Sequence, residues 1–302
     1  MKRKICNILF GLLFLFGFLV LAYPTIADQW NTYRQNRLIS SYEAAVEKME
    51  PEDFTKEWEA ARQLNSTLKQ NNIYGDVFST DEEELESTEY WKVLNIGGDG
   101  VMGYLSIPKI NVKISIYHGS SDDVLQTGAG HLDGTGLPIG GSGTHSVLAA
   151  HRGLPSARLF TDLDQLVQGD LFYIHVLDET LAYQVDQILN MVDKDDRGTL
   201  EEALQVVSGE DHVTLFTCTP YGVNSHRLLV RGTRVPYEGE EELESAAADT
   251  MLQAVQNYYM LYLILGLSVT LLVILAMKFL FGRNRKKNRR NRTEQSSKEG
   301  KK

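Results

Sequence analysis

The sequence predicts a mainly β domain, a closed barrel or a sandwich, flanked by two apolar segments. From Val101 onward, short runs of alternating apolar and polar residues follow one another. Gly, Asn and Pro separate these runs, and few helical patterns lie between them, which is typical of barrels and sandwiches. Of the 302 residues, 43% are hydrophobic and 23% are charged. This composition excludes a disordered, collagen-like or low-complexity chain.

Seven of these runs are predicted as strands. They cover residues 103–107, 112–116, 146–150, 171–176, 181–185, 212–216 and 227–232. The glycine-rich segment from Gly128 to Gly143 lacks the Lys-Ser/Thr pair of a phosphate-binding loop. We therefore expect turns there and no nucleotide site.

Helical patterns precede the strands. Ser40 with Glu43 resembles a capping box, and Pro51 suits the first turn of a second helix. The apolar residues of that second helix recur at helical spacing: Phe54, Trp58, Ala61 and Leu64. We expect this face to pack on the domain.

Two uncharged stretches, Ile5–Ala22 and Met260–Met277, are each long enough to span a bilayer as a helix. Basic residues flank both of them, at 2–4 and at 283–292. Because basic flanks stay cytoplasmic, we expect both termini inside and the middle of the chain outside the cell. The middle, residues 28–257, carries a net charge of −22 and the two ends together carry +12, which gives the overall net charge of −10.

Each end has a second interpretation. The basic tail would also suit a nucleic acid, but flanks of membrane helices have the same composition, so no nucleic-acid partner is expected. The N-terminal segment could be a cleaved signal peptide with Thr25-Ile26-Ala27 as its site. Tyr23-Pro24 make that site irregular, and we favour a retained segment.

Cys218 is the only cysteine of the outer body, because Cys6 lies in the first apolar stretch. A lone cysteine is most often a small buried hydrophobe. Here it ends a strand on which Thr214, Phe216 and Cys218 share one face. Turn formers then follow, and the chain returns with Arg227. A cation beside a thiol favours the reactive thiolate.

A general acid/base must be a histidine, because arginine stays protonated. His151 closes an apolar strand at the matching end of the domain and is the candidate. His226 would point to the opposite face of its strand from Arg227. His131 and His145 fall in the glycine-rich turns, where we expect hydrogen-bonded structural roles. The sequence has no Cys-x-x-Cys or His-x-x-x-His spacing, so no metal or other cofactor is expected.

These residues resemble the sortase family. The resemblance extends from about Gly75 to Pro236 and is carried by Thr214–Cys218 with Arg227, and by Ala150–Pro155. The segments 100–110 and 116–119 and the C-terminal apolar stretch are similar to the class C, pilus-assembling branch. The resemblance implies an eight-stranded closed β-barrel, with Cys218, His151 and Arg227 as the catalytic set.

Class C sortases commonly have a lid with an Asp-Pro-aromatic motif before the barrel. The matching residues here are Asp76-Val77-Phe78. The resemblance implies that Asp76 meets Arg227 and that Phe78 covers the thiol. Val77 replaces the proline, so the backbone of this motif lacks a fixed φ.

The expected organisation follows from the resemblance and the apolar segments. We expect an N-terminal transmembrane segment or signal anchor at 1–27, a helical region at 28–74 and a lid-like acidic loop at 75–95. The sortase β-barrel catalytic domain is expected at 96–236, followed by an acidic linker and helix at 237–257. A C-terminal transmembrane helix at 258–281 and a basic cytoplasmic tail at 282–302 complete the expected organisation.

The resemblance implies a membrane-anchored cysteine transpeptidase with its catalytic domain outside the cell. It would cleave an LPxTG-like sorting signal between Thr and Gly through a cysteine thioester and pass the acyl group to a pilin lysine. Its partners would be pilins or surface proteins with such signals. Three alternatives stay open: a housekeeping sortase that uses the cell-wall cross-bridge, a cysteine peptidase, and a non-catalytic surface binding module.

Overall fold

The computed structural model describes residues 2–68, 85–239, 241, 266 and 268. The chain separates into two compact units, Met1–Ala248 and Asp249–Lys302. Nearly all described residues belong to the first unit, and the following concerns that unit alone.

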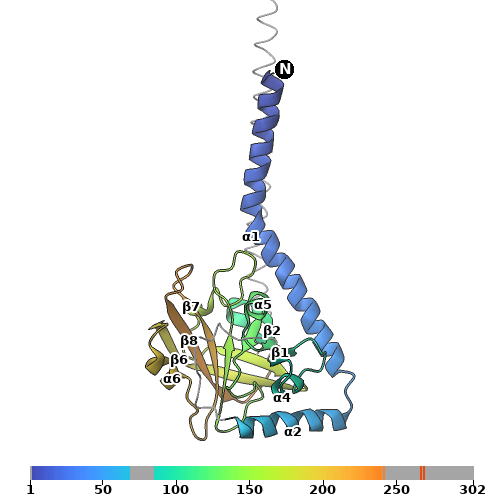
Figure 1. The fold of residues 1–302 in the computed structure, drawn as a ribbon, viewed down its shortest axis with the longest axis vertical. Helices are drawn as coiled ribbons and strands as arrows, with labels where there is room; N and C mark the ends of the chain where they lie inside the picture. The colour runs from blue at the N-terminus through green and yellow to red at the C-terminus, as the bar shows by residue number, and fades with distance from the viewer. Residues whose placement is uncertain (1, 69–84, 240, 242–265, 267, 269–302) are drawn as a thin grey trace, which may run out of the picture. The chain divides into compact units, whose positions relative to one another are not determined.

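Eight strands close into a barrel (Figure 1). They are β1 (Val101–Ile107), β2 (Val112–His118), β3 (Ala129–His131), β4 (Thr144–Ala149), β5 (Leu171–Val176), β6 (Glu179–Asp193), β7 (Asp211–Thr219) and β8 (His226–Val235). The order around the barrel is β1-β2-β3-β4-β7-β8-β6-β5, and β5 pairs with β1. The pairs β2–β3 and β4–β7 are parallel and the others antiparallel. The predicted eight-stranded closed barrel is thus confirmed.

Strand β3 lies inside the segment that we predicted as turns, and that prediction was wrong for Ala129–His131. Three residues are too few to show alternation. Gly130 explains how they fit, because a Cβ atom there would lie 2.3 Å from the carbonyl oxygen of Gly119. Glycine here allows a close approach of two backbones and does not mark a turn.

The first helix, α1, runs without interruption from Lys2 to Val46 and contains Pro24. The predicted helix start at Ser40 was therefore wrong, since the helix is already formed there. Its last turns are fixed by packing: Ile39 and Tyr42 are buried in a cluster with residues of β1. Tertiary contacts, and not the capping pattern at Ser40, determine that this segment is helical throughout.

Helix α2 (Pro51–Thr67) begins at Pro51 as predicted. The backbone N–H of Glu50 donates to Asp53 Oδ2 over 3.3 Å at this start. Trp58 and Ala61 are buried against the barrel, which confirms the apolar face. The other helices within residues 85–239 are short: α4 (Glu89–Lys92), α5 (Asp122–Thr127), α6 (Arg197–Ala203), η1 (Pro108–Ile110) and η2 (Leu163–Gln165).

Over the described part of the chain, no helix combines the length and the hydropathy that crossing a membrane requires.

The two faces of the sheet carry separate apolar clusters. Leu148, Leu215 and Leu228 belong to the main core, which includes residues of all eight strands. Their chain neighbours Ala149 and Phe216 belong to a second cluster with Ala203 and Leu204 from α6 and the residue after it. Successive side chains of a strand point to opposite faces. Helix α6 therefore packs on the outer face of β4, β7 and β8.

Strand β6 is longer than its neighbour β5. Residues Glu179–Gln184 pair with β5, whereas pairing with β8 extends from Ala182 to Asp193. Register shifts occur between Val185 and Gln187 and again between Leu189 and Val192. Met191, in the second shift, has a φ of +65°. These bulges hide the alternation, so the sequence predicted only residues 181–185 of this strand.

Candidate active site

Cys218 and Arg227 are directly opposite each other on the antiparallel strands β7 and β8. The chain reverses between them as the turn formers predicted. The backbone N–H groups of Val223 and Asn224 both donate to the carbonyl of Pro220 over 3.0 Å, and Asn224 adopts a φ of +60°. Cys218 is half-buried, and the turn brings the guanidinium strand back beside it.

His151 follows β4, the other neighbour of β7. These two strands are parallel, with Ala149 opposite Phe216. The pairing continues, because Ala150 N donates to Phe216 O over 3.2 Å and Thr217 Oγ1 donates to Ala150 O over 2.7 Å. His151 and Cys218 each follow the Ala149–Phe216 pair by two residues. The fold thus brings His151, Cys218 and Arg227 to one end of three adjacent strands.

All three residues fall on the outer face of the sheet. Cys218 is two residues from Phe216, and Arg227 is two residues from Leu229, and both of these apolar residues pack beneath α6. The alternation of β4 assigns His151 to the same face as Ala149. The candidate site therefore continues the face that α6 covers, at the point where the apolar cluster ends.

The surroundings of the candidate base and guanidinium differ. Burial lowers the pKa of His151 below its ordinary 6.5, and the carboxylate of Asp122 opposes this shift. The lowered pKa favours the neutral imidazole, which can accept a proton. Arg227 is 5% exposed, and its Nη1 donates to the carbonyls of Asn224 and His226 over 3.1 Å each. The turn itself orients the guanidinium.

Arg152 is a residue to which the sequence assigned no role. Its side chain is buried beside the site and makes three hydrogen bonds. Nη1 donates to Thr219 Oγ1 over 3.0 Å, Nε to the carbonyl of Thr161 over 3.1 Å, and Nη2 to Asp164 Oδ2 over 2.5 Å. An arginine in a polar loop has no periodic pattern, so only the contacts reveal it.

The other histidines considered in the sequence, His226, His131 and His145, make hydrogen-bond contacts of their own. His226 Nδ1 and Ser225 Oγ are 2.8 Å apart. His131 and His145 lie on β3 and β4, not in turns as expected. They are hydrogen-bonded, as the sequence predicted: His131 contacts Tyr90 Oη and Gly136 O, each at 2.8 Å. Burial lowers the pKa of both His131 and His145 to about 4.

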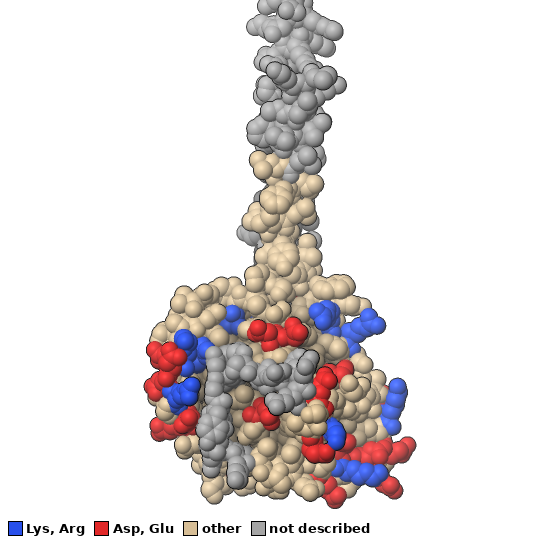
Figure 2. Space-filling view, viewed as in Figure 1, with Lys and Arg blue, Asp and Glu red and all other residues tan. Residues whose placement is uncertain are grey.

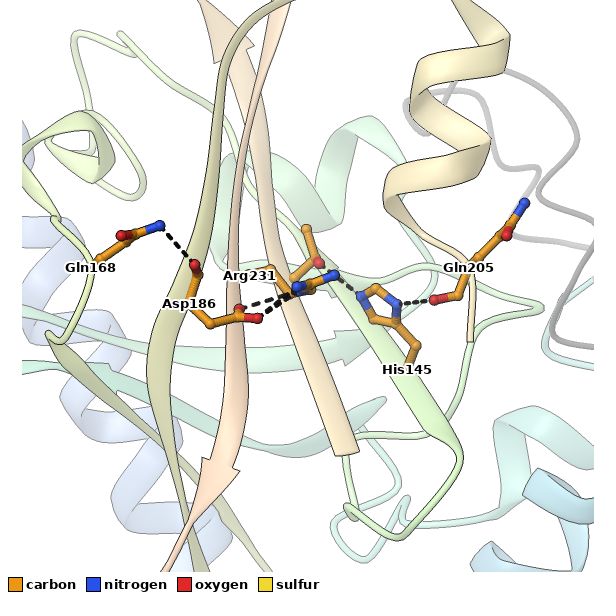
Figure 3. Close-up of polar contacts among 6 residues, drawn as sticks. His145, Gln168, Asp186, Gln205 and Arg231 are labelled. Carbon is orange, nitrogen blue, oxygen red and sulfur yellow. Dashed lines mark hydrogen bonds and ion pairs between the residues drawn. The ribbon is translucent and has the colours of Figure 1, made fainter. Parts of the chain in front are cut away.

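A second polar cluster lies further along β4, β7 and β8 from the candidate site. Figure 3 shows His145, Asp186, Gln205 and Arg231 of this cluster. Arg231 of β8 donates through Nη2 to Asp186 Oδ2 over 2.6 Å. His145 Nε2 contacts Thr214 Oγ1 at 2.7 Å, and its Nδ1 contacts the carbonyl of Gln205 at 2.9 Å. The last contact fastens the segment after α6 to β4. The cluster thus holds the end of the β6–β7 connection in place.

The expected lid residues Asp76 and Phe78 lie outside the described residues. Within the ranges that the structure describes, no group of three or more His, Cys, Asp or Glu side chains is arranged to hold a metal ion.

A family model and curated proteins both show similarity to sortases. The sortase-domain family model matches residues 105–235. Among curated proteins, sortase A of Bacillus anthracis is 24% identical over 236 residues, which are 78% of this chain and 96% of that protein. Sortase D of Bacillus subtilis is 29% identical over 136 residues, which are 44% of this chain and 63% of that protein.

Solved structures are more similar. Sortase C1 of Streptococcus agalactiae is 49% identical, with a TM-score of 0.59, over 67% of this chain and 100% of that one. A sortase C of Streptococcus pneumoniae, described with its pilin substrate specificity, is 44% identical with the same TM-score, over 67% and 97%. The closed barrel, the cysteine at the end of β7 and these similarities agree: the chain belongs to the sortase family of cysteine transpeptidases, in its class C branch.

Proposed function

We propose that the protein cleaves an LPxTG-like sorting signal between Thr and Gly and transfers the acyl group to the side-chain amine of a pilin lysine. The observation that carries this proposal is the direct pairing of Cys218 with Arg227, together with the matching position of His151 after β4. Nucleophile, cation and imidazole then occupy adjacent strands, as a thiol-based acyl transfer requires.

In the proposed reaction, the sulfur of Cys218 attacks the threonine carbonyl while the thiol proton passes to His151. The tetrahedral intermediate collapses, the C–N bond breaks, and His151 returns the proton to the leaving glycine amine. The resulting thioester conserves the activation of the acyl group without a nucleotide. An incoming lysine amine then loses a proton to His151, attacks the thioester and releases the Cys218 thiol.

Arg227 is proposed to stabilise the oxyanion of both tetrahedral intermediates. Two backbone carbonyls already hold its Nη1 in place. A donor that is fixed before the reaction costs no reorganisation when negative charge develops. Arginine also stays protonated throughout, so it contributes charge and hydrogen bonds but no proton transfer.

The choice of a pilin as partner is supported by the streptococcal sortase C structures, which reach 40–49% identity, one of them described with its pilin substrate specificity. Two other fates of the thioester use the same site. A cell-wall cross-bridge amine would give anchored surface proteins, and water would give simple cleavage. Only the acceptor distinguishes these three outcomes, so the products must be identified.

We also propose that the protein is held at the cell membrane with its barrel outside. The described side chains of α1 before Asp28 are uncharged, as their tan colour in Figure 2 shows. Many are apolar and exposed, among them Leu13, Phe16, Leu19 and Leu21 at 54–78%. Exposed apolar residues on a long helix fit a lipid environment better than water. The basic residues at 2–4 support a cytoplasmic N-terminus.

The test is mass spectrometry of the purified protein incubated with a sorting-signal peptide. We expect an acyl adduct on Cys218 and release of the glycine-containing fragment. Adding a pilin should give an isopeptide-linked ladder, whereas a housekeeping activity would give single cross-bridge conjugates. Absence of the adduct, with Cys218 still accessible to a small thiol reagent, would overturn the proposed function and favour a binding module.

A further inference from the structure

We infer that Arg152 is a positioning residue for the transfer reaction: it fixes the loop that carries His151 against the end of β7 that carries Cys218. This inference rests on the proposed function, since it assigns Arg152 the task of setting the geometry between the proposed base and nucleophile. Arg152 itself makes its contacts with protein groups and acts through its neighbours.

The first argument is where its three hydrogen bonds lead. Arg152 follows His151 directly, and Thr219, which accepts from Nη1 over 3.0 Å, follows Cys218 directly. The other two bonds lead to Thr161 O and to Asp164 Oδ2, in the segment that returns to the barrel through η2. The guanidinium of the residue after His151 thus links the residue after Cys218 to the far end of the loop.

The second argument is burial. The side chain of Arg152 is 8% exposed, whereas Asp164 is 42% exposed. A buried cation is costly unless its donors are satisfied, and here each of its three nitrogens has an acceptor in a different direction. A lysine would keep the charge but could not reproduce three fixed directions from a planar group. The arrangement therefore specifies arginine by its geometry as well as by its charge.

The loop around Arg152 is also fixed by backbone hydrogen bonds and by close packing against the β7–β8 turn. The carbonyl of His151 accepts from Phe160 N over 3.2 Å, and Gly153 N donates to Thr161 Oγ1 over the same distance. Gly153 has a φ of +85°, and a Cβ atom there would lie 3.0 Å from the ring of Tyr221 in the β7–β8 turn. The loop thus lies directly against the turn that orients Arg227.

The same loop supplies a matched control. Arg158 pairs with Asp162, four residues further on, but its side chain is 56% exposed and the pair does not reach β7. An exposed pair of this kind contributes little. If ion pairs merely stabilised the loop, Arg152 and Arg158 would behave alike. The positioning role instead predicts that only Arg152 affects the reaction.

The experiment measures the rate of Cys218 acylation by a sorting-signal peptide across the pH range, with the full-length chain. In Arg152→Lys and Thr219→Val we expect the maximal acylation rate to fall by about 100-fold, as for a small misplacement of reacting groups, with a much smaller change in KM. The pH at which the rate is half-maximal should move, because the environment of His151 changes. Thr219→Ser retains the acceptor and should restore most of the rate. Arg158→Lys should match the parent protein.

Circular dichroism and thermal unfolding identify any variant that fails to fold. If Arg152→Lys does not fold, the Thr219→Val and Thr219→Ser pair decides the question. Parent-like rates and pH profiles in folded Arg152→Lys or Thr219→Val would overturn the inference. So would equal losses in Thr219→Val and Thr219→Ser. If the parent protein forms no adduct at all, the proposed function fails instead, and the two failures are thereby distinguished.

Discussion

Cys218 and Arg227 are paired across β7 and β8, so their side chains leave the sheet on the same face. No later movement of a loop is needed to bring the thiol and the guanidinium together. Their relation depends on strand register alone. The register is in turn fixed by the five residues between Thr219 and Ser225 and by apolar pairs further along, such as Phe216 with Leu229.

The first prediction concerns the nucleophile. Cys218→Ala should abolish both the acyl adduct and any polymer, because no other cysteine lies in the barrel. The fold should persist, since the exchange removes a single sulfur atom from a half-buried position. Mass spectrometry and thermal unfolding measure the two effects. Polymer formed by folded Cys218→Ala would contradict the thioester mechanism.

The second prediction concerns the guanidinium. Arg227→Lys keeps the charge but loses the planar group that Asn224 and His226 orient through Nη1. We expect kcat to fall by about 10²–10³-fold, the usual loss for an oxyanion donor. Single-turnover acylation rates provide the measurement. A lysine variant as active as the parent would make Arg227 a simple point charge.

The third prediction concerns close backbone packing in the barrel. A Cβ atom on Gly103 would lie 2.2 Å from the backbone carbonyl oxygen of His175, at the β1–β5 pairing that closes the barrel. Gly103→Ala should therefore lower the free energy of unfolding by about 1–3 kcal/mol or more. Gly198→Ala in α6 is the control, because its Cβ would meet only Asp196 Oδ1, at 3.8 Å. Chemical denaturation compares them, and equal stability of the two variants would contradict the prediction.

The fourth prediction concerns pH. His131 and His145 have pKa values lowered by burial from 6.5 to about 4. The unfolded chain therefore takes up protons on these groups between about pH 6.5 and 4 while the folded chain does not. Each histidine should remove about 1.4 kcal/mol of stability per pH unit as the pH falls through this window. Above pH 6.5 this contribution should be constant.

His145→Gln isolates one of these contributions. The pKa of His145 depends on the charges of His212, Arg231 and Asp186 as well as on burial. The relevant quantity is therefore the difference in the free energy of unfolding between the parent and the variant at each pH. Urea denaturation at several pH values between 7 and 4 should show a shallower loss in the variant. Parallel curves would mean that His145 titrates alike in the folded and unfolded chains.

Local pattern was sufficient to predict how the residues of the candidate site are brought together. Alternation located most strands, and the turn formers between Cys218 and Arg227 predicted their pairing. His151 could be proposed because it ends an apolar run. Each of these three residues lies at or next to the end of a strand, and strand ends can be recognised from the local sequence pattern.

The missed features depend on contacts that local pattern does not contain. Arg152 reaches Thr219, 67 residues away along the chain. Strand β3 needs glycine where the backbone of Gly119 approaches, and the pattern of the surrounding glycines suggested turns. Ser40 carries a helix-start pattern, but α1 continues through it because its neighbours Ile39 and Tyr42 pack on β1.

The bulges of β6 have a consequence for self-association. Beyond Val185 the described pairing of this strand is with β8 alone, so its other side is a potential edge for the addition of a further strand. The two register shifts and the left-handed Met191 bend that edge away from the straight, regular form that edge-to-edge aggregation requires. An enzyme proposed to handle extended peptides at the far end of this strand therefore carries built-in protection against fibre-like stacking of its own barrels.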